Sequence, residues 1–353
     1  MRWPWQRTSR SDQVVVSWSG GTFAFVRAKA AADGTFSVLA HGVERLGSGG
    51  QEELVQRLQA LGLKGLQVHA MLRPEQYQLL QIDTPPVAPE ELRAAARFQI
   101  REMVNAHMDD ITLDVMHVGD GQNRGAAHLF VVAARNDVIR EVLSLGDAMG
   151  WTVSVIDIQE TAQRNLQTLL ARSEGRVERA DAALLISDTQ QALLTISANE
   201  ELFLTRRLDV PQGFHDTDWE QLLAASTPLA TDAYTPVSEY VPEYAGGGAG
   251  SMDYGQGTAT ADSDRMQRLV VEVQRSLDLW DRTWSSMPLS GLRVHLGGHS
   301  DHLASWLGRE LGQTVTPMGF TAHFTGLQDA NPTDLAYCLS LLGVLLRVES
   351  RKL

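Results

Sequence analysis

Small residues lie at a tight turn near the start of the chain, and their chemistry suits a phosphate group. The segment VVVSWSGGTF places Gly20, Gly21 and Thr22 between two apolar runs that are typical of strands. Glycine adopts turn conformations that other residues avoid, and it lets backbone N–H groups approach an anion closely. By residue type, this turn could cradle a phosphate through backbone contacts.

A cluster of histidines raises the question of a metal site. The segment HLGGHSDH contains His295, His299 and His302, with Asp301 between the last two. A zinc site needs such side chains to converge on one point. His295 lies on a predicted strand and the glycines after it redirect the chain, so we predict no metal site. No Ser/His/Asp or Cys/His set stands out, and GQNRG (121–125) lacks the lysine and helix of a phosphate loop.

Composition excludes several classes of partner. The chain has 353 residues, enough for two domains, and a formal net charge of -13. This charge argues against general binding to nucleic acid or to anionic lipid. The single cysteine, Cys338, excludes an intramolecular disulfide and a thiolate metal cluster. Its neighbours are apolar, which predicts a buried packing residue.

No segment is predicted to span a membrane. The longest strongly apolar stretch, from Leu335 to Leu346, is too short for that and is typical of a buried helix. The first residues lack the apolar core of a signal peptide. Two tryptophans beside arginines at this end leave open a contact with a membrane interface, although a frayed terminus is the simpler interpretation.

The candidate site residues lie on a pattern of alternating strands and helices. This pattern predicts an α/β protein. Each half of the chain begins with a β-hairpin that carries a tight turn, at about 13–31 and about 180–208. This duplication suggests two related domains with a cleft between them. Between the halves of the first domain, strands and helices from about Tyr77 to Val155 form a small αβ module, with one helix opening at Pro89.

One stretch of the second half has a different composition. From Gly213 to Asp264 the chain contains acidic residues but no Lys or Arg, and its AGGGAGSMDYGQG segment cannot build a core. We predict an acidic disordered insertion here. Four tyrosines within it leave a recognition motif open as an alternative: Tyr234, Tyr240, Tyr244 and Tyr254.

These observations predict the following division of the chain. The parts are a flexible N-terminus (1–12), a first domain (13–170) with the inserted module (about 77–155), a second domain (171–347) with the acidic insertion (about 213–264), and a C-terminal tail (348–353).

Four segments, in their order and spacing, resemble a known family. They are LRPEQYQLLQIDTPPVAPEELRAAARFQIREMV, VSVIDIQETAQRNL, LFLTRRL, and EVQRSLDLW followed by LGG. Together they resemble the MshI family, the PilM-like proteins of mannose-sensitive haemagglutinin (MSHA) type IV pilus biogenesis, over nearly the full length. The acidic insertion is where the chain departs most from that pattern.

The resemblance implies an actin-like ATPase fold, that is, a duplicated ribonuclease H-like fold with a nucleotide cleft and a small inserted module in the first domain. It also implies a partner, a PilN-like single-pass inner-membrane protein whose cytoplasmic N-terminal peptide is bound, with the groove between the module and the first strands as the expected site. The protein would then be cytoplasmic, peripherally associated with the inner membrane through partners, and would help to connect an assembly motor to the envelope apparatus.

The same resemblance permits a comparison with nucleotide-binding relatives, whose two turns each resemble Asp-Ile-Gly. In the first turn, Ser17 stands where the metal-organising Asp would be, and Ser19 where the first Gly would be. The second turn, LLISDTQQALL, has a shifted Asp188, no glycine, and bulky Gln190 and Gln191. We therefore interpret the second turn as one without a ligand.

The adenosine end of the cleft is better preserved by this comparison. Glu272 and Arg275 match positions that contact the base and ribose, and Gly297 and Gly298 would let a flat base approach the backbone. An ordinary intrahelical ion pair between Glu272 and Arg275 and an ordinary strand end remain the alternative interpretation.

The favoured hypothesis is a pilus-assembly scaffold with a degenerate nucleotide cleft, not an enzyme, with no cofactor expected. The main alternative is an ATP/Mg-binding conformational switch of the same complex, in which Gly20, Gly21, Thr22, Glu272, Arg275, Gly297 and Gly298 hold the nucleotide. A sugar kinase of the same fold is disfavoured, because neither a catalytic Asp in the second half nor two intact phosphate turns are evident.

Overall fold

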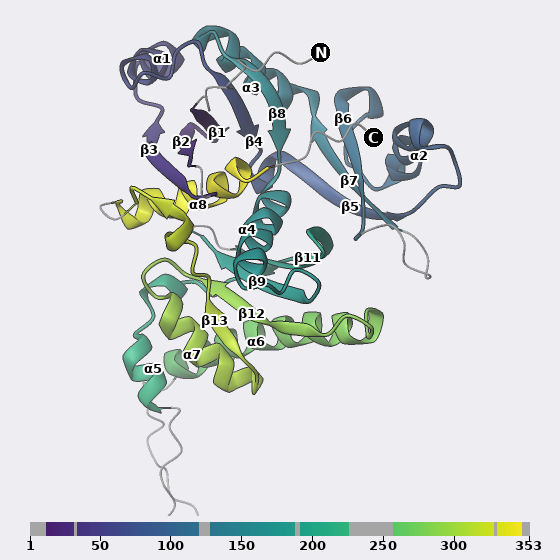
Figure 1. Ribbon diagram of the computed structural model, residues 1–353, viewed down its shortest axis with the longest axis vertical. Coiled ribbons are helices and arrows are strands. Elements are labelled where there is room, and N and C mark those ends of the chain that lie inside the picture. The colour runs from purple at the N-terminus through teal and green to yellow at the C-terminus, as the bar shows by residue number, and fades with distance from the viewer. Residues whose placement is uncertain are drawn as a thin grey trace, which may run out of the picture.

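The computed structural model describes residues 12–31, 34–119, 128–187, 191–225, 257–327 and 330–347. These residues form two large sheets stacked along the long axis of the molecule, with a small third sheet to one side of the first (Figure 1). No helix in these ranges is both long and apolar enough to cross a membrane.

The first large sheet has six strands in the order β14-β3-β2-β1-β4-β8. Strands β1 to β3 pair antiparallel, whereas β4, β8 and β14 pair parallel with their neighbours. Apolar side chains alternate between its two faces, as the period of a strand requires. The strands are β1 (Gln13–Ser19), β2 (Thr22–Ala30), β3 (Phe36–Arg45), β4 (Gln67–Met71), β8 (Thr152–Asp157) and β14 (Phe324–Thr325).

Helices cover both faces of this sheet. Helices α1 (Gly50–Ala60) and α3 (Asn136–Met149) pack on the face that carries Val14 and Val16. Helices α4 (Gln159–Ser173) and α8 (Pro332–Leu345) pack on the opposite face, in a core that also includes Ala183 and Leu185 of the second sheet. Cys338 lies in this shared core, fully buried, so the predicted packing role is confirmed.

The second sheet has five strands in the order β11-β10-β9-β12-β13. Helices α6 (Gly257–Thr283) and α7 (Ser300–Leu311) cover its outer face. Polar side chains of α4 bind its inner face, where the Gln163 amide donates to the backbone carbonyls of Ala183 and Leu193. The strands are β9 (Ala180–Ile186), β10 (Gln191–Ala198), β11 (Glu201–Asp209), β12 (Leu289–His295) and β13 (Val315–Pro317).

Five strands of each large sheet share one connectivity. The order β3-β2-β1-β4-β8 in the first sheet corresponds to β11-β10-β9-β12-β13 in the second. In both, three antiparallel strands precede two strands that pair parallel. The predicted duplicated fold is therefore confirmed.

The inserted module is a three-stranded sheet in the order β5-β7-β6, covered by helix α2 (Leu92–Gln99). Its strands are β5 (Tyr77–Asp83), β6 (Ile111–His117) and β7 (His128–Arg135). The helix that we expected from Pro89 is divided into 3-10 turns at 89–91 and 100–102 around α2. The predicted range of 77–155 extends too far, because α3 packs in the core of the first sheet and β8 pairs with β4.

Both ends of the predicted acidic disordered insertion at 213–264 are ordered, which corrects that prediction. Helix α5 (Trp219–Ala225) lies near its start, and α6 begins at Gly257. Phe214 and Trp219 are buried, and their rings lie 5.3 Å apart at 80°. These aromatic side chains bury enough apolar surface to fix the segment despite its acidic surroundings. Residues 226–256, with the four tyrosines, lie outside the described residues, as do 1–11 and 348–353.

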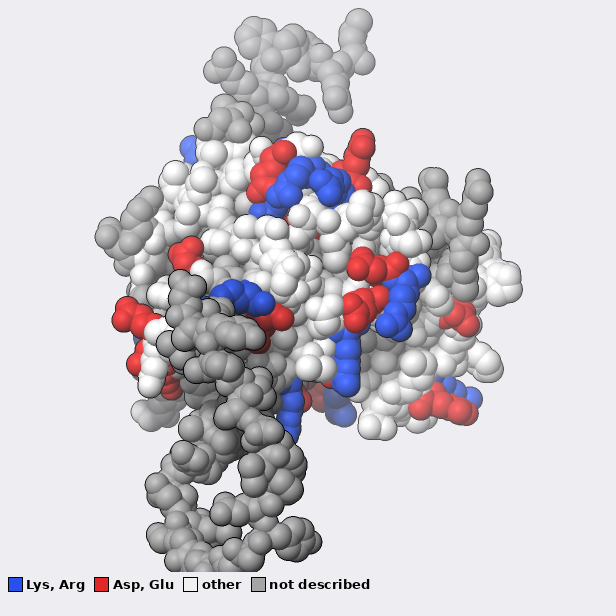
Figure 2. Space-filling model, turned by 90° about the horizontal axis from the view of Figure 1, so that it is seen from below, with Lys and Arg blue, Asp and Glu red and all other residues white. Residues whose placement is uncertain are grey.

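Charged side chains are interspersed over the lower face of the molecule. On the described part of the face shown in Figure 2, acidic and basic groups alternate in small clusters. The net charge of -13 is thus not gathered into one patch there.

Candidate functional site

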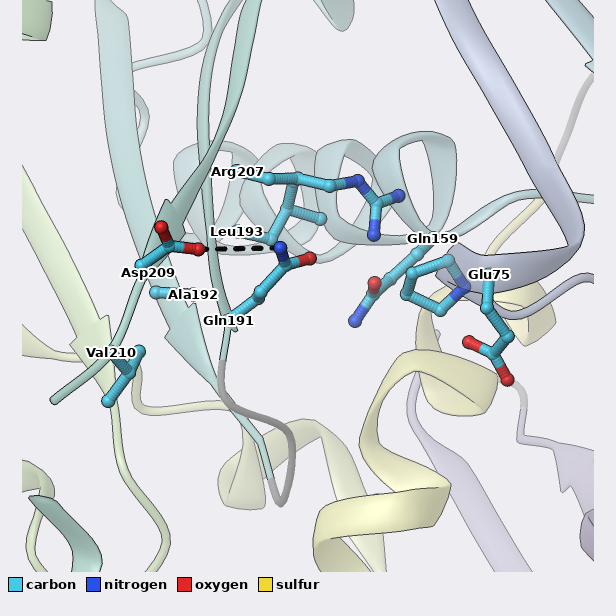
Figure 3. A pocket seen from close by; sticks show the side chains of 9 residues that line it. Glu75, Gln159, Gln191, Ala192, Leu193, Arg207, Asp209 and Val210 are labelled. Carbon is cyan, nitrogen blue, oxygen red and sulfur yellow. Dashed lines mark hydrogen bonds between the residues drawn. The ribbon is translucent and has the colours of Figure 1, made fainter. Parts of the chain in front are cut away.

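A cavity of about 480 Å³ lies between the two domains. Figure 3 shows that its lining comes from the segment after β4, the start of α4, and the ends of β10 and β11. Its lining residues are Pro74, Glu75, Gln159, Gln191, Ala192, Leu193, Arg207, Asp209 and Val210. Charged and amide groups from both halves therefore meet at the place where an interdomain ligand would bind.

The predicted phosphate turn joins β1 to β2 beside this cavity. Gly20 and Gly21 have φ angles of +57° and +75°, as a two-residue hairpin loop with two left-handed residues requires. Neither of their N–H groups donates a hydrogen bond to another described residue. Gly20, Gly21 and Thr22 are not among the lining residues, but the Ser19 hydroxyl of the same turn donates to Glu75 at 2.5 Å.

Ser17 occupies a buried position on β1. Its side chain is only 2% exposed, and its hydroxyl oxygen has no hydrogen-bond partner within the described chain. A carboxylate at this position would be buried, and it would need a cation nearby to remain ionised. The acidic group that contacts the turn is instead Glu75, which comes from the loop after β4.

The second turn is described only in part. Asp188 and Gln190 lie outside the described residues. Gln191 opens β10 and lines the cavity, where its amide donates to Asp209 at 3.5 Å (Figure 3). The amide and the carboxylate thus face the cavity at the end of the β10–β11 hairpin.

A buried cluster of three side chains joins the domains next to the cavity. The Arg207 guanidinium donates to the Tyr77 hydroxyl at 2.8 Å and to Glu160 at 2.6 Å. The Tyr77 hydroxyl donates to the other oxygen of Glu160 and accepts from the Gln159 N–H at 3.2 Å. The pKa of Tyr77 is raised well above its usual range, mainly by burial and secondly by the negative charge of Glu160. The hydroxyl therefore stays protonated.

A second, larger cavity of about 780 Å³ lies between β11 and α6. Arg206 donates to Glu272 at 2.8 Å, and Arg275 donates to the other oxygen of the same carboxylate at 2.6 Å. Both hydrogen bonds lower the pKa of Glu272, and the one from Arg275 has the larger effect. The arginines of the lining are Arg206, Arg207, Arg268 and Arg275. The intrahelical ion pair that we weighed as an alternative therefore exists, and it belongs to a larger basic group.

The glycine pair predicted for the base lies elsewhere. Gly297 and Gly298 follow β12, which is separated from β11 by two strands. They are not among the lining residues of the cavity that contains Glu272 and Arg275. The predicted base contacts are thus divided between two places of the second domain, and their role in binding a nucleotide stays a prediction.

The three histidines also do not converge. Within the described part of the chain, no group of three or more His, Cys, Asp or Glu side chains is placed to hold a metal ion. His295 is buried against Phe320, with ring centroids 5.4 Å apart, and its Nε2 accepts the N–H of Gly297 at 3.3 Å. Burial lowers the pKa of His295 to about 4, so the ring is neutral near pH 7.

Arg206 and Arg207 were not among the residues predicted for the site, although their segment LFLTRRL carried part of the resemblance. Two consecutive arginines on a strand are a weak signal, because such residues usually lie at the surface. What gives them a role is their acidic partners on α6 and α4, which are 66 and 47 residues away in the sequence.

Comparison with solved structures settles the fold. The chain is similar to a protein in the "PilM-PilN type IV pilus biogenesis complex", with 19% identity, a TM-score of 0.60, and coverage of 95% of this chain and 99% of the other. The chain has the actin-like fold. Its two sheets of equal connectivity and the cleft between them are the features that carry this assignment.

Other solved structures match with lower scores. One is a Bacteroides thetaiotaomicron protein with an actin-like ATPase fold and unknown function, at 9% identity, a TM-score of 0.44, and coverage of 95% and 96%. Another is the cytoplasmic domain of EpsL, an inner membrane component of the type II secretion system of Vibrio cholerae, at 18% identity, a TM-score of 0.40, and coverage of 66% and 80%. No protein-family model and no curated protein matches the chain.

Proposed function

We propose that this chain is a cytoplasmic scaffold of a type IV pilus biogenesis complex of the MSHA type. In this proposal it binds the cytoplasmic N-terminal peptide of a PilN-like inner-membrane protein and stays peripheral to the membrane through that partner. The observation that carries the proposal is the similarity to the PilM–PilN complex over 95% of the chain, inserted module included.

A scaffold needs a rigid shape more than it needs a complete nucleotide site. Ser17 supplies no carboxylate at the first turn, and Arg207, which lines the interdomain cavity, is paired with Glu160. These observations support a cleft that holds its shape through protein contacts. In this proposal the cleft is degenerate and no ATP is hydrolysed.

Co-purification tests the scaffold role. The full chain is expressed together with a PilN-like protein from the same organism. The partner is used in two forms, one intact and one without its cytoplasmic N-terminal segment. We expect the intact partner to co-purify with the chain and the truncated one to be lost. Recovery of both partners in equal amounts would contradict the proposed peptide contact, and recovery of neither would contradict the scaffold role.

A second function, an ATP-binding switch, is favoured by one feature. The cavity beside α6 is lined by four arginines, and the Gly20–Gly21 turn keeps its N–H groups free among the described residues. Both suit an anionic ligand. In this case ATP would shift the protein between an open and a closed cleft by its difference in affinity for the two. Mg-ATP titration of the wild type and of Glu272→Gln tests it, since a switch requires the wild type to bind and the variant to bind more weakly.

A further inference from the structure

The inserted module holds the second domain at two points along the edge strand β11. At one end of the strand, the Gly119 N–H, which follows β6, donates to the Leu202 carbonyl at 2.8 Å. Five residues further along, Arg207 reaches the Tyr77 hydroxyl of the module's first strand at 2.8 Å. The module therefore bridges the two domains instead of projecting from the first alone.

The contact at Gly119 is closely packed. Gly119 has a φ of +65°, and a Cβ atom on it would lie 2.3 Å from the Phe203 ring. Beside it, Val118, Phe130 and Leu202 form a small buried apolar cluster. Because so little free space remains, the module and β11 cannot slide past each other without breaking this packing.

The contact at Arg207 is charged and largely buried. The Glu160 side chain is 2% exposed and that of Arg207 is 26% exposed. A buried carboxylate that loses its cationic partner is strongly unfavourable, so the pair holds the Arg207 guanidinium in place beside the Tyr77 hydroxyl of the module. The Arg207 guanidinium also lies over the Tyr77 ring, 5.4 Å from its centroid, which adds a cation–π contact.

Arg207 also borders both cavities. It lines both the interdomain cavity and the cavity beside α6, together with Asp209 and Val210. Figure 3 shows its side chain extended from β11 toward Gln159 and Glu75, across the interdomain cavity. The two cavities lie on opposite faces of β11, and this side chain belongs to the interdomain one.

We infer that Arg207 is a latch between the inserted module and the second domain. While it is paired with Tyr77 and Glu160, the first strand of the module stays docked beside β11. When it leaves them, the module loses one of its two contacts with β11 and is able to move away from that strand. This movement needs no separation of the two large sheets, which share the core around α4 and α8.

Hydrogen exchange of backbone amides in the full chain tests the latch. The decisive variant is Arg207→Gln, and Arg206→Gln is its matched control, because Arg206 is the adjacent residue but pairs with Glu272 on α6. The readout is the Gly119 N–H, which is bonded to Leu202 and lies outside the Arg207 cluster. We expect Arg207→Gln to accelerate its exchange about tenfold or more, because charged hydrogen bonds that held the module on the second domain are lost. Arg206→Gln should leave it near the wild-type rate.

Unchanged exchange at Gly119 in Arg207→Gln, or equal acceleration in both variants, would overturn the inference. If Arg207→Gln does not fold, Tyr77→Phe decides the matter. This variant keeps the aromatic ring and the Arg207–Glu160 pair but removes the hydroxyl that joins them to the module. A latch predicts a smaller but measurable acceleration at Gly119, and no acceleration contradicts it.

Discussion

Arg206 and Arg207 are consecutive residues of β11, yet they pair with carboxylates on opposite faces of the second sheet. Arg206 donates to Glu272 of α6 on the outer face, and Arg207 donates to Glu160 of α4 on the inner face. The alternation of side chains along a strand explains the division. One edge strand thereby connects the helix expected to contact a nucleotide with the helix that lies between the domains.

Substitutions at Ser17 test whether the cleft still accepts a metal-bound nucleotide. Ser17→Asp places a carboxylate at a position that is 2% exposed, so we expect a loss of about 2–4 kcal/mol in the free energy of unfolding. We predict that Mg-ATP does not restore the melting temperature, because the proposed cleft lacks a nucleotide site. The measurement is thermal unfolding with and without Mg-ATP.

The control for this experiment is Ser17→Ala. It removes a hydroxyl that has no described hydrogen-bond partner, so its effect on stability should be close to zero or slightly favourable. Full recovery of Ser17→Asp by Mg-ATP, and not by ATP alone, would contradict the scaffold account and support the switch.

Gly343 tests the packing of the two helices between the sheets. It lies within α8, where alanine would ordinarily stabilise a helix by about 1 kcal/mol. A Cβ atom here would lie 2.1 Å from the Ala162 carbonyl oxygen of α4, so we predict that Gly343→Ala destabilises by about 1–3 kcal/mol instead. Gly146→Ala in α3 is the control, since its Cβ would meet only a Val153 methyl group at 3.2 Å. Chemical denaturation of both variants should show the difference, and equal midpoints would refute the close helix contact.

Substitution of Trp219 tests whether the start of the acidic segment belongs to the folded core. Its ring is 2% exposed and packs against Phe214 and Trp306, with ring centroids 5.3 and 6.0 Å away. Trp219→Ala should therefore cost about 3–5 kcal/mol of folding free energy. Phe98→Ala on the module, where the side chain is 76% exposed, should change stability by no more than about 0.5 kcal/mol. A neutral effect of Trp219→Ala in thermal unfolding would show that this segment does not belong to the core.

The burial of His295 should make the free energy of unfolding depend on pH. Burial lowers its pKa from 6.5 to about 4, so the unfolded chain binds its proton first as the pH falls. Its contribution to stability is therefore complete above pH 6.5 and is lost between pH 6.5 and about 4. We expect His295→Gln to flatten the fall in the free energy of unfolding over this range, as measured by urea titrations at successive pH values. His299→Gln, at an exposed neighbouring position, controls for the loss of one histidine, and an equal flattening in both variants would refute the assignment.

Local features of the sequence predicted the framework well. The Gly20–Gly21 turn, the apolar run around Cys338 and the repeated hairpin all depend on neighbouring residues, and each is present. The acidic residues around Phe214 and Trp219 concealed two core aromatics, because composition averages over a window while burial depends on single side chains.

The site could be predicted only in part, because its contacts are long-range. The resemblance to nucleotide-binding relatives placed Glu272 and the glycine pair at one predicted base site. In the folded chain, however, Glu272 contacts β11, whereas Gly297 follows β12. Two other strands, β10 and β9, lie between these two strands. The Arg207 cluster joins residues from positions 77, 160 and 207, which no local pattern relates.

Calorimetric titration of the chain with the cytoplasmic N-terminal peptide of the PilN-like partner, with and without Mg-ATP, tests the central claim most directly. The scaffold account predicts that the peptide binds with a similar affinity in both conditions and that Mg-ATP alone gives no binding heat. Absence of peptide binding in both conditions, or binding of Mg-ATP at micromolar concentration together with a change in peptide affinity, would contradict it.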